Sequence, residues 1–239
     1  MCFTVNVNLV KEELENRYGA TFLDPDSYRP SYYYHAFSLP DLPAICSDSP
    51  DKIQLLRWGL IPSWTKTSTD AAGVRLKTFN ARSESIQDKP SFSGSFISKR
   101  CLIPVKGFFE WQHNGREKTP WYISHFGDEV MSLAGLYDEW TENETGNLLR
   151  TFSIITTDAN SLLSEIHNSK KRMPVVLEKS SEKNWIDLSM TKSEAMELLK
   201  PIPSENFKAH TIGPLINSRT AEKNSPEVIR PFSYGNLLF

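Results

Sequence analysis

The chain is poor in cysteine and has no long apolar run. Its 239 residues include three cysteines, Cys2, Cys46 and Cys101, which lie far apart. This number and spacing argue against a disulfide framework and a zinc cluster, and favour a reducing, cytoplasmic location. No apolar run approaches the roughly 18–20 residues of a membrane span. The first residues also lack the basic segment and cleavage site of a signal peptide, so we expect no membrane association.

A large net charge is also absent. The 27 Lys and Arg nearly balance the 29 Asp and Glu, which leaves a net charge of −2 and no bulk indication of nucleic-acid binding. The distribution is uneven, because residues 57–106 hold nine basic and three acidic side chains, whereas residues 107–150 hold three basic and eight acidic ones. Basic residues interleaved with aromatic ones could hold a single strand through phosphate contacts and base stacking. Charge alone favours the simpler interpretation, a solvated basic face over an aromatic core.

Repeats and low-complexity linkers are missing as well, and the length suits one domain over residues 1–239. Strands are predicted at residues 3–8, 32–38, 53–59, 101–105, 107–112, 120–126, 130–137, 150–157 and 207–212. Helices are predicted up to Tyr18, at 159–166, at 180–188, and from Thr191, which forms a capping box with Glu194. Residues 62–78 are expected to be irregular. Strands dominate the middle without alternating regularly with helices, which predicts an α+β fold on a curved antiparallel sheet or pseudo-barrel with flanking helices.

The second residue is a candidate nucleophile. Removal of Met1, which is usual before a small residue, would leave Cys2 with an α-amine and a thiol on one carbon framework. The amine has an ordinary pKa near 7.7–8.0, and a thiolate is a good nucleophile. An aldehyde can condense with the amine and then close to a five-membered thiazolidine ring with the thiol. Position alone is equally compatible with a cysteine placed there by chance.

Two further segments contain candidate proton-transfer groups. Glu110 lies between aromatic residues in the run CLIPVKGFFEW, where burial would raise the pKa of its carboxyl group toward neutrality. An outward-facing position on an alternating strand is the alternative. His167 lies where a predicted helix ends, before Arg172-Met173-Pro174, and could act as a proton shuttle, although a lone histidine is more often structural. No two histidines have the spacing of metal ligands, so we expect neither a metal nor another cofactor.

Two polar or aromatic runs complete the set. TFNARSES, residues 78–85, offers the amide of Asn80 to orient a ligand and the guanidinium of Arg82 for a phosphate. The N-terminal turn of a helix is an equally good interpretation of this polar run. The run WGLIPSW, from Trp58 through Pro62 to Trp64, reads as a strand that enters a rigid aromatic turn, and by itself would be assigned to the core.

The order of these motifs is more specific than any one of them. Cys2, WGLIPSW, NARSE, GFFEW and H-x4-RMPVVL, followed by a late segment that contains Asn217, resemble the SRAP (SOS response-associated peptidase) family from residue 2 to about 220. The resemblance implies a pseudo-barrel protein of the DNA-damage response that crosslinks its N-terminal cysteine to abasic sites in single-stranded DNA through a thiazolidine. It also implies a peptidase activity that releases the residues before the cysteine. The expected protein is a monomer that associates with the nucleoid when it is bound to DNA.

Roles follow from the resemblance for individual positions. Cys2 would be the nucleophile, Asn80 would orient the N-terminal region or the sugar, Glu110 would assist proton transfer, and His167 would catalyse ring opening and reversal. The expected DNA-contacting residues are Trp58, Pro62, Trp64, Arg82 and Arg172.

Two positions depart from the family pattern. Phe3-Thr4 stands where members commonly have Gly-Arg, and four residues separate His167 from Arg172 where the family usually has one.

Two other functions start from the same residues. An N-terminal-nucleophile amidase or glutamine amidotransferase would also begin with cysteine, but that class favours a four-layered αββα architecture. A single-strand binding module without covalent chemistry would make Cys2 incidental.

Overall fold

A closed barrel of five strands forms the centre of the computed structural model, which describes residues 2–127 and 129–235. The barrel strands are β5 (Ser49–Trp58), β4 (Asp41–Cys46), β7 (Arg100–Val105), β10 (Met131–Thr141) and β11 (Leu148–Asp158). Neighbouring strands are antiparallel, and a parallel pairing of β11 with β5 closes the ring. Four short strands extend it, namely β2 (Thr21–Phe22), β6 (Asn80–Arg82), β12 (Arg172–Pro174) and β13 (Val176–Leu177).

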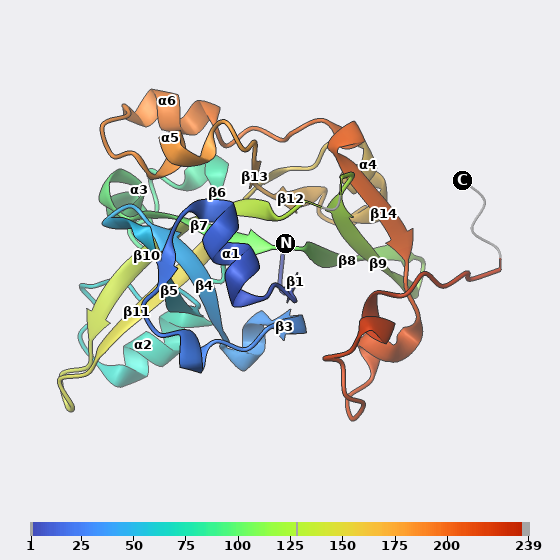
Figure 1. The fold of residues 1–239 in the computed structure, drawn as a ribbon, viewed down its shortest axis with the longest axis horizontal. Coiled ribbons are helices and arrows are strands. Elements are labelled where there is room, and N and C mark those ends of the chain that lie inside the picture. The colour runs from blue at the N-terminus through green and yellow to red at the C-terminus, as the bar shows by residue number, and fades with distance from the viewer. Residues whose placement is uncertain (1, 128, 236–239) are drawn as a thin grey trace.

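A second, antiparallel sheet lies beside the barrel (Figure 1). Its order is β14 (Phe207–Thr211), β9 (Glu117–His125), β8 (Gly107–Asn114), β1 (Thr4–Val7) and β3 (Ser31–His35). The chain passes from barrel strand β7 to β8 through one residue, Lys106, so the two sheets are directly joined. Strand β1 lies near the middle of the molecule (Figure 1). Cys2 stands two residues before this strand and belongs to the large core cluster.

Helices flank the two sheets. They are α1 (Lys11–Tyr18), α2 (Ser68–Arg75), α3 (Ser93–Ser98), α4 (Ser161–Ile166), α5 (Glu182–Ile186) and α6 (Lys192–Glu197). The α+β prediction with a pseudo-barrel is therefore confirmed. So are the end of α1 at Gly19, which adopts φ +63°, and the capping box between Thr191 and Glu194. Among the described residues, no helix has the length and apolar character needed to cross a membrane.

Several elements differ from the sequence prediction or escaped it, among them α2, α3 and β4. Residues 62–78 are not wholly irregular, because the Thr67 side chain accepts a hydrogen bond from the Asp70 N–H and starts α2. Helix α3 was not predicted. Strand β4 was not predicted either, since it contains Pro43, which cannot donate to a neighbouring strand. Pro43 is tolerated because β7 pairs with β4 only beyond it, at Ile45 and Cys46.

The core contains a large cluster between the sheets, a smaller one under the C-terminal segment, and a third that includes Trp140. Alternation along β8 sends Phe108 to the large cluster and Phe109 to the smaller one, which also contains Tyr122. Gly107 opens β8 because a Cβ atom there would lie 2.4 Å from the ring of Tyr122. The strand that carries Glu110 is therefore held in position by close packing on both faces.

Candidate active site

Cys2 is completely buried, two residues before β1. The Asn80 side-chain amide donates a hydrogen bond of 2.9 Å to the carbonyl oxygen of Cys2. Asn80 is itself fixed by β6, which pairs in parallel with β11 at Ile154. Burial, followed by the nearby carboxylate of Glu110, raises the pKa of the Cys2 thiol far above its usual range. The thiol is thus protonated at neutral pH, and Asn80 holds the backbone next to it.

Glu110 points into the protein rather than outward. It shares a face of β8 with Phe108, and its exposed fraction is 4%. Val5 pairs with Phe108 in antiparallel register, so the chain before Val5 runs toward Glu110. Burial raises the pKa of Glu110 to about 7. A carboxyl group with this pKa can donate or accept a proton near neutral pH.

His167 follows the last residue of α4 and faces Glu110. Its Nε2 lies 4.0 Å from Oε2 of Glu110, and its Nδ1 lies 2.7 Å from the carbonyl oxygen of Arg172. A carbonyl oxygen only accepts hydrogen bonds, so Nδ1 carries the proton and Nε2 is the basic nitrogen. Burial lowers the pKa of His167 to about 4, so the ring is neutral at pH 7. At pH 7 the carboxyl group of Glu110, which acts on Cys2, is thus about half protonated, and it faces the neutral, basic imidazole of His167.

An open cleft of about 640 Å³ leads to this pair. Its wall includes Phe3, the residue directly after Cys2, and the side chains of Glu110 and His167. The other lining residues are aromatic, polar or basic, namely Trp111, His113, Arg116, Lys118, Lys170 and Asn217. The Trp111 indole N–H donates to the side-chain oxygen of Asn217 at 2.9 Å, which fixes the aromatic wall.

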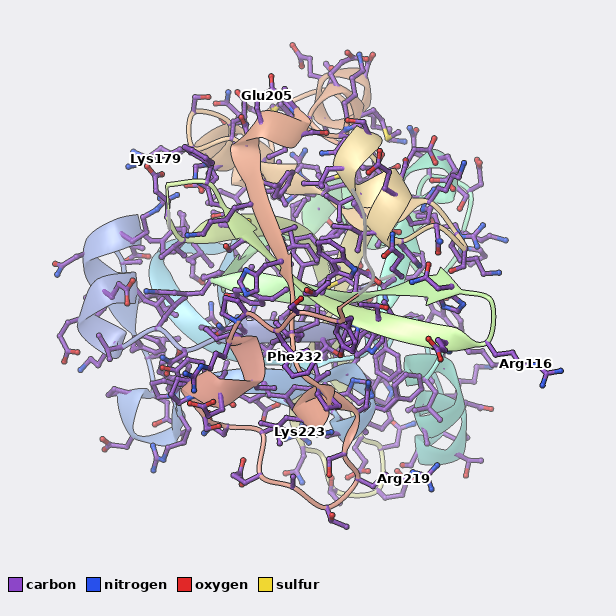
Figure 2. The ribbon with its side chains drawn as sticks, turned by 90° about the vertical axis from the view of Figure 1, so that its right-hand side faces the viewer. Arg116, Lys179, Glu205, Arg219, Lys223 and Phe232 are labelled. Carbon is purple, nitrogen blue, oxygen red and sulfur yellow. The ribbon has the colours of Figure 1, made fainter. Side chains whose placement is uncertain are left out.

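Three exposed cations at the cleft were not predicted. Arg116 comes from the turn of the hairpin between β8 and β9, Lys118 from the start of β9, and Lys170 from the loop after α4. Figure 2 shows Arg116 projecting from the tip of this hairpin. Gly115 could have indicated the hairpin turn, because it is a glycine between two predicted strands. In the structure it adopts φ +63° in this tight turn. Nothing in the sequence indicated that Lys170 would meet this hairpin.

The basic stretch 57–106 does not line the cleft, and several of its charges are used in structural pairs. Arg57 pairs with Asp41 at 2.8 Å and Lys99 with Asp138 at 2.6 Å. Arg100 is buried and donates to a backbone carbonyl. The hypothesis that this stretch forms the DNA-facing surface is not supported by the cleft, whose cations come from other segments.

Two of the residues predicted to contact DNA are placed in the interior instead. Trp58 is completely buried, donates its indole N–H to the Phe79 carbonyl at 2.9 Å and stacks on Phe152 inside the barrel. The prediction that it walls a DNA site is therefore wrong, because aromatic residues at strand spacing serve a core equally well. Pro62 is also buried, so the same prediction fails for it.

Trp64 and Arg82 are exposed but outside the cleft lining. Trp64 has an exposed fraction of 59% and lines a separate hollow with Lys66 and Lys77. Arg82 is exposed at the end of β6, two residues after Asn80. Both keep the accessibility that a DNA contact requires, and their role stays a prediction.

The Arg172 side chain is held by hydrogen bonds within the protein. Its guanidinium makes two hydrogen bonds to the Glu84 carboxylate, at 2.7 and 2.9 Å, and one of 2.7 Å to the Thr156 carbonyl. Its exposed fraction is 7%. The predicted DNA contact is contradicted in this structure, since the side chain is buried and both terminal nitrogens of the guanidinium already donate within the protein. Arg172 instead joins the NARSE and RMP motifs and presents its carbonyl to His167.

Within the described ranges, His, Cys, Asp and Glu side chains form no group of three or more that could hold a metal ion. The polar groups near Cys2 include the Asn80 amide and the Glu110 carboxyl group, and the His167 imidazole lies 4.0 Å from that carboxyl group, a set suited to moving protons. Of the predicted site residues, the fold brings together Cys2, Asn80, Glu110 and His167.

Comparison with known proteins agrees with this arrangement. The family model described as "SOS response associated peptidase (SRAP)" matches residues 1–219. The abasic site processing protein YoqW of Bacillus subtilis is 38% identical over 210 residues, which cover 87% of this chain and 89% of that protein. The abasic site processing protein HMCES of Gallus gallus is 32% identical, over 79% of this chain and 60% of that protein.

A solved structure shares the fold closely. A crystal structure of a Bacteroides thetaiotaomicron protein superposes with a TM-score of 0.91 at 36% identity, and the match covers 97% of this chain and 100% of that one. Sequence, site geometry and fold agree, and the chain belongs to the SOS response associated peptidase (SRAP) family.

Proposed function

We propose that this protein processes abasic sites in single-stranded DNA by forming a covalent thiazolidine crosslink through Cys2 after Met1 is removed. The observation that carries the proposal is the convergence of Asn80, Glu110 and His167 on the residue that would bear both the α-amine and the thiol. The names of the relatives support the substrate, since YoqW and HMCES are both abasic site processing proteins.

The first step is opening of the deoxyribose ring. The closed hemiacetal gives its C1′ hydroxyl proton to Nε2 of His167, the bond between C1′ and the ring oxygen breaks, and Glu110 gives a proton to that oxygen. A neutral imidazole and a carboxyl group with a pKa of about 7 suit these roles at neutral pH. The product is an open-chain aldehyde.

The second step joins the aldehyde to the protein. The Cys2 amine adds to the aldehyde carbon, and loss of one water gives an imine. The thiol then adds to the imine carbon, its proton passes to the nitrogen, and the five-membered ring closes. A protonated, buried thiol fits a sequence in which the amine reacts first. The three cations at the cleft would contact the phosphates on either side of the sugar.

The family's peptidase activity fits the same location. The peptide bond to be cut joins Met1 to Cys2, so removal of the preceding residue and exposure of the amine would be one event. The fold does not favour the amidase alternative, because a five-stranded barrel with short flanking helices lacks the four layers of that class.

A crosslinking gel tests the proposal. Wild type, Cys2→Ala, Glu110→Gln and His167→Ala are incubated with a single strand whose uracil has been excised, and with the same strand carrying intact uracil. We expect a stable adduct only for wild type on the abasic strand, slower formation with Glu110→Gln and His167→Ala, and none with Cys2→Ala. An adduct that persists in Cys2→Ala contradicts the thiazolidine.

The same samples separate the alternative functions. Salt-sensitive binding without any adduct would identify a non-covalent single-strand binding module. Hydrolysis of glutamine that is lost in Cys2→Ala would identify an amidase.

A further inference from the structure

The loop between His167 and Arg172 is longer than the family pattern, yet its ends remain together. The Lys171 N–H donates to the His167 carbonyl at 2.8 Å, and Nδ1 of His167 reaches the Arg172 carbonyl at 2.7 Å. Lys171 adopts φ +49°, a left-handed conformation that a non-glycine residue rarely takes. The additional residues therefore form an exposed turn that keeps His167 hydrogen-bonded to the backbone of Lys171 and Arg172.

Asn168 attaches this turn to strand β8. Its side-chain oxygen accepts from the His113 N–H at 3.0 Å, and its side-chain nitrogen donates to the His113 carbonyl at 2.9 Å. An amide that satisfies both backbone groups of one residue imitates the pairing of a neighbouring strand. The pairing of β1 with β8 covers Gly107 and Phe108, so Asn168 occupies β8 at His113, beyond the end of that pairing.

The two ends of this attachment adjoin the two proton-transfer groups. Asn168 directly follows His167, and His113 lies three residues after Glu110 on one strand. The same turn places Lys170 in the cleft lining. Nε2 of His167 and Oε2 of Glu110 lie 4.0 Å apart. The two hydrogen bonds between Asn168 and His113 thus join the segments that carry these two side chains.

We propose that Asn168 is a positioning residue, which fixes His167 against Glu110 for opening of the sugar ring and holds Lys170 at the cleft. This inference rests on the proposed function. Proton transfer requires heavy atoms within about 2.6–3.2 Å, and misplacement by about 1 Å can slow a reaction roughly 100-fold. Loss of the attachment therefore impairs the step that uses His167, while the amine and thiol of Cys2 keep their own environment.

Two aldehyde substrates separate the opening of the sugar ring from the condensation with the amine and thiol of Cys2. An abasic single strand must be opened before it reacts, whereas propanal is already an open aldehyde and needs only the amine and the thiol. Single-turnover adduct formation is measured by intact mass for wild type, Asn168→Ala and His167→Ala. The matched control is Asn143→Ala, because the Asn143 amide also donates to a backbone carbonyl, that of Lys66, in a different hairpin.

We expect Asn168→Ala to react about 10- to 100-fold more slowly with the abasic strand and within about twofold of wild type with propanal. His167→Ala should show the same selectivity, and Asn143→Ala should match wild type on both substrates. An unchanged rate on the abasic strand, or an equal loss on both aldehydes, overturns the positioning role. If wild type forms no adduct with the abasic strand, the proposed function itself fails.

Discussion

The buried carboxyl group of Glu110 should reduce the stability of the fold as the pH rises from 4.5 to about 7. Its pKa is about 7 in the folded protein against an ordinary value of 4.5, so the folded state holds the proton more tightly than the unfolded chain. Its contribution to stability is therefore full below pH 4.5 and is lost as the pH rises to 7. Glu110→Gln removes this titration and should gain about 3 kcal/mol relative to wild type between pH 4 and pH 8, at about 1.4 kcal/mol per pKa unit.

Urea denaturation of both proteins at several pH values measures this difference. Glu117→Gln, at an exposed position in the same hairpin, should track wild type. A difference between Glu110→Gln and wild type that does not change with pH would show that Glu110 titrates normally. Burial lowers the pKa of His167, so this side chain reduces stability as the pH falls below 6.5. Both proteins contain His167, and its contribution therefore cancels in the difference between them.

Arg172 should matter for stability rather than for DNA affinity. Lysine keeps the charge but cannot make the paired hydrogen bonds to Glu84 or the bond to the Thr156 carbonyl. Arg172→Lys should therefore lower the free energy of unfolding by about 2–3 kcal/mol. The salt dependence of single-strand binding should stay that of wild type. A reduced salt slope with unchanged stability would restore the phosphate contact predicted from the sequence.

At the scale of elements, Gly107 is required by the ring that covers the start of β8. A Cβ atom there would lie 2.4 Å from Tyr122, whose hydroxyl also accepts from the Asn6 amide at 2.9 Å. Gly107→Ala should destabilise the protein by about 1–3 kcal/mol and slow crosslinking, because Glu110 lies on the same strand. Gly73→Ala is the control, since space is open at that helical position, and it should be neutral or slightly stabilising. The melting temperatures of both variants test this prediction, and equal melting temperatures would contradict the steric argument.

Elements with local signals could be predicted from the sequence, and those fixed by distant contacts could not. The capping box at Thr191 and the end of α1 at Gly19 depend on neighbouring residues, and both were predicted. Trp58 and Trp64 belong to one sequence motif, but Trp58 lies in the core and Trp64 on the surface. Their spacing along the chain does not distinguish these two locations. Strand β4 was missed because its proline is acceptable only where β7 is not yet paired.

At the scale of the whole molecule, the cleft should give the protein its salt-dependent affinity for single strands. Lys118 and Lys170 reach it from segments about 50 residues apart in the chain, so no local charge count could find them. Each lost phosphate contact should lower the slope of log K against log salt by about 0.7. The double variant Lys118→Ala and Lys170→Ala should therefore lower the slope by about 1.4.

The matched control removes two exposed lysines elsewhere, Lys192 and Lys200, the first in α6 and the second just after it. Helix α6 lies across the molecule from β8 and β9 (Figure 1). Fluorescence titration of a single strand at several salt concentrations should give the control the slope of wild type. Equal slopes in both double variants would place the DNA elsewhere.

The central claim is that the reactive group at residue 2 is the amine and the thiol together. The most direct test is the intact mass of the protein after reaction with an abasic single strand, for the form that begins at Cys2 and the form that retains Met1. The form that begins at Cys2 should gain the mass of the strand less one water and resist heating. A molecule that still carries Met1 at the end of the reaction has the thiol but no amine on Cys2, and should gain nothing. A stable adduct of equal yield in both forms would contradict the claim.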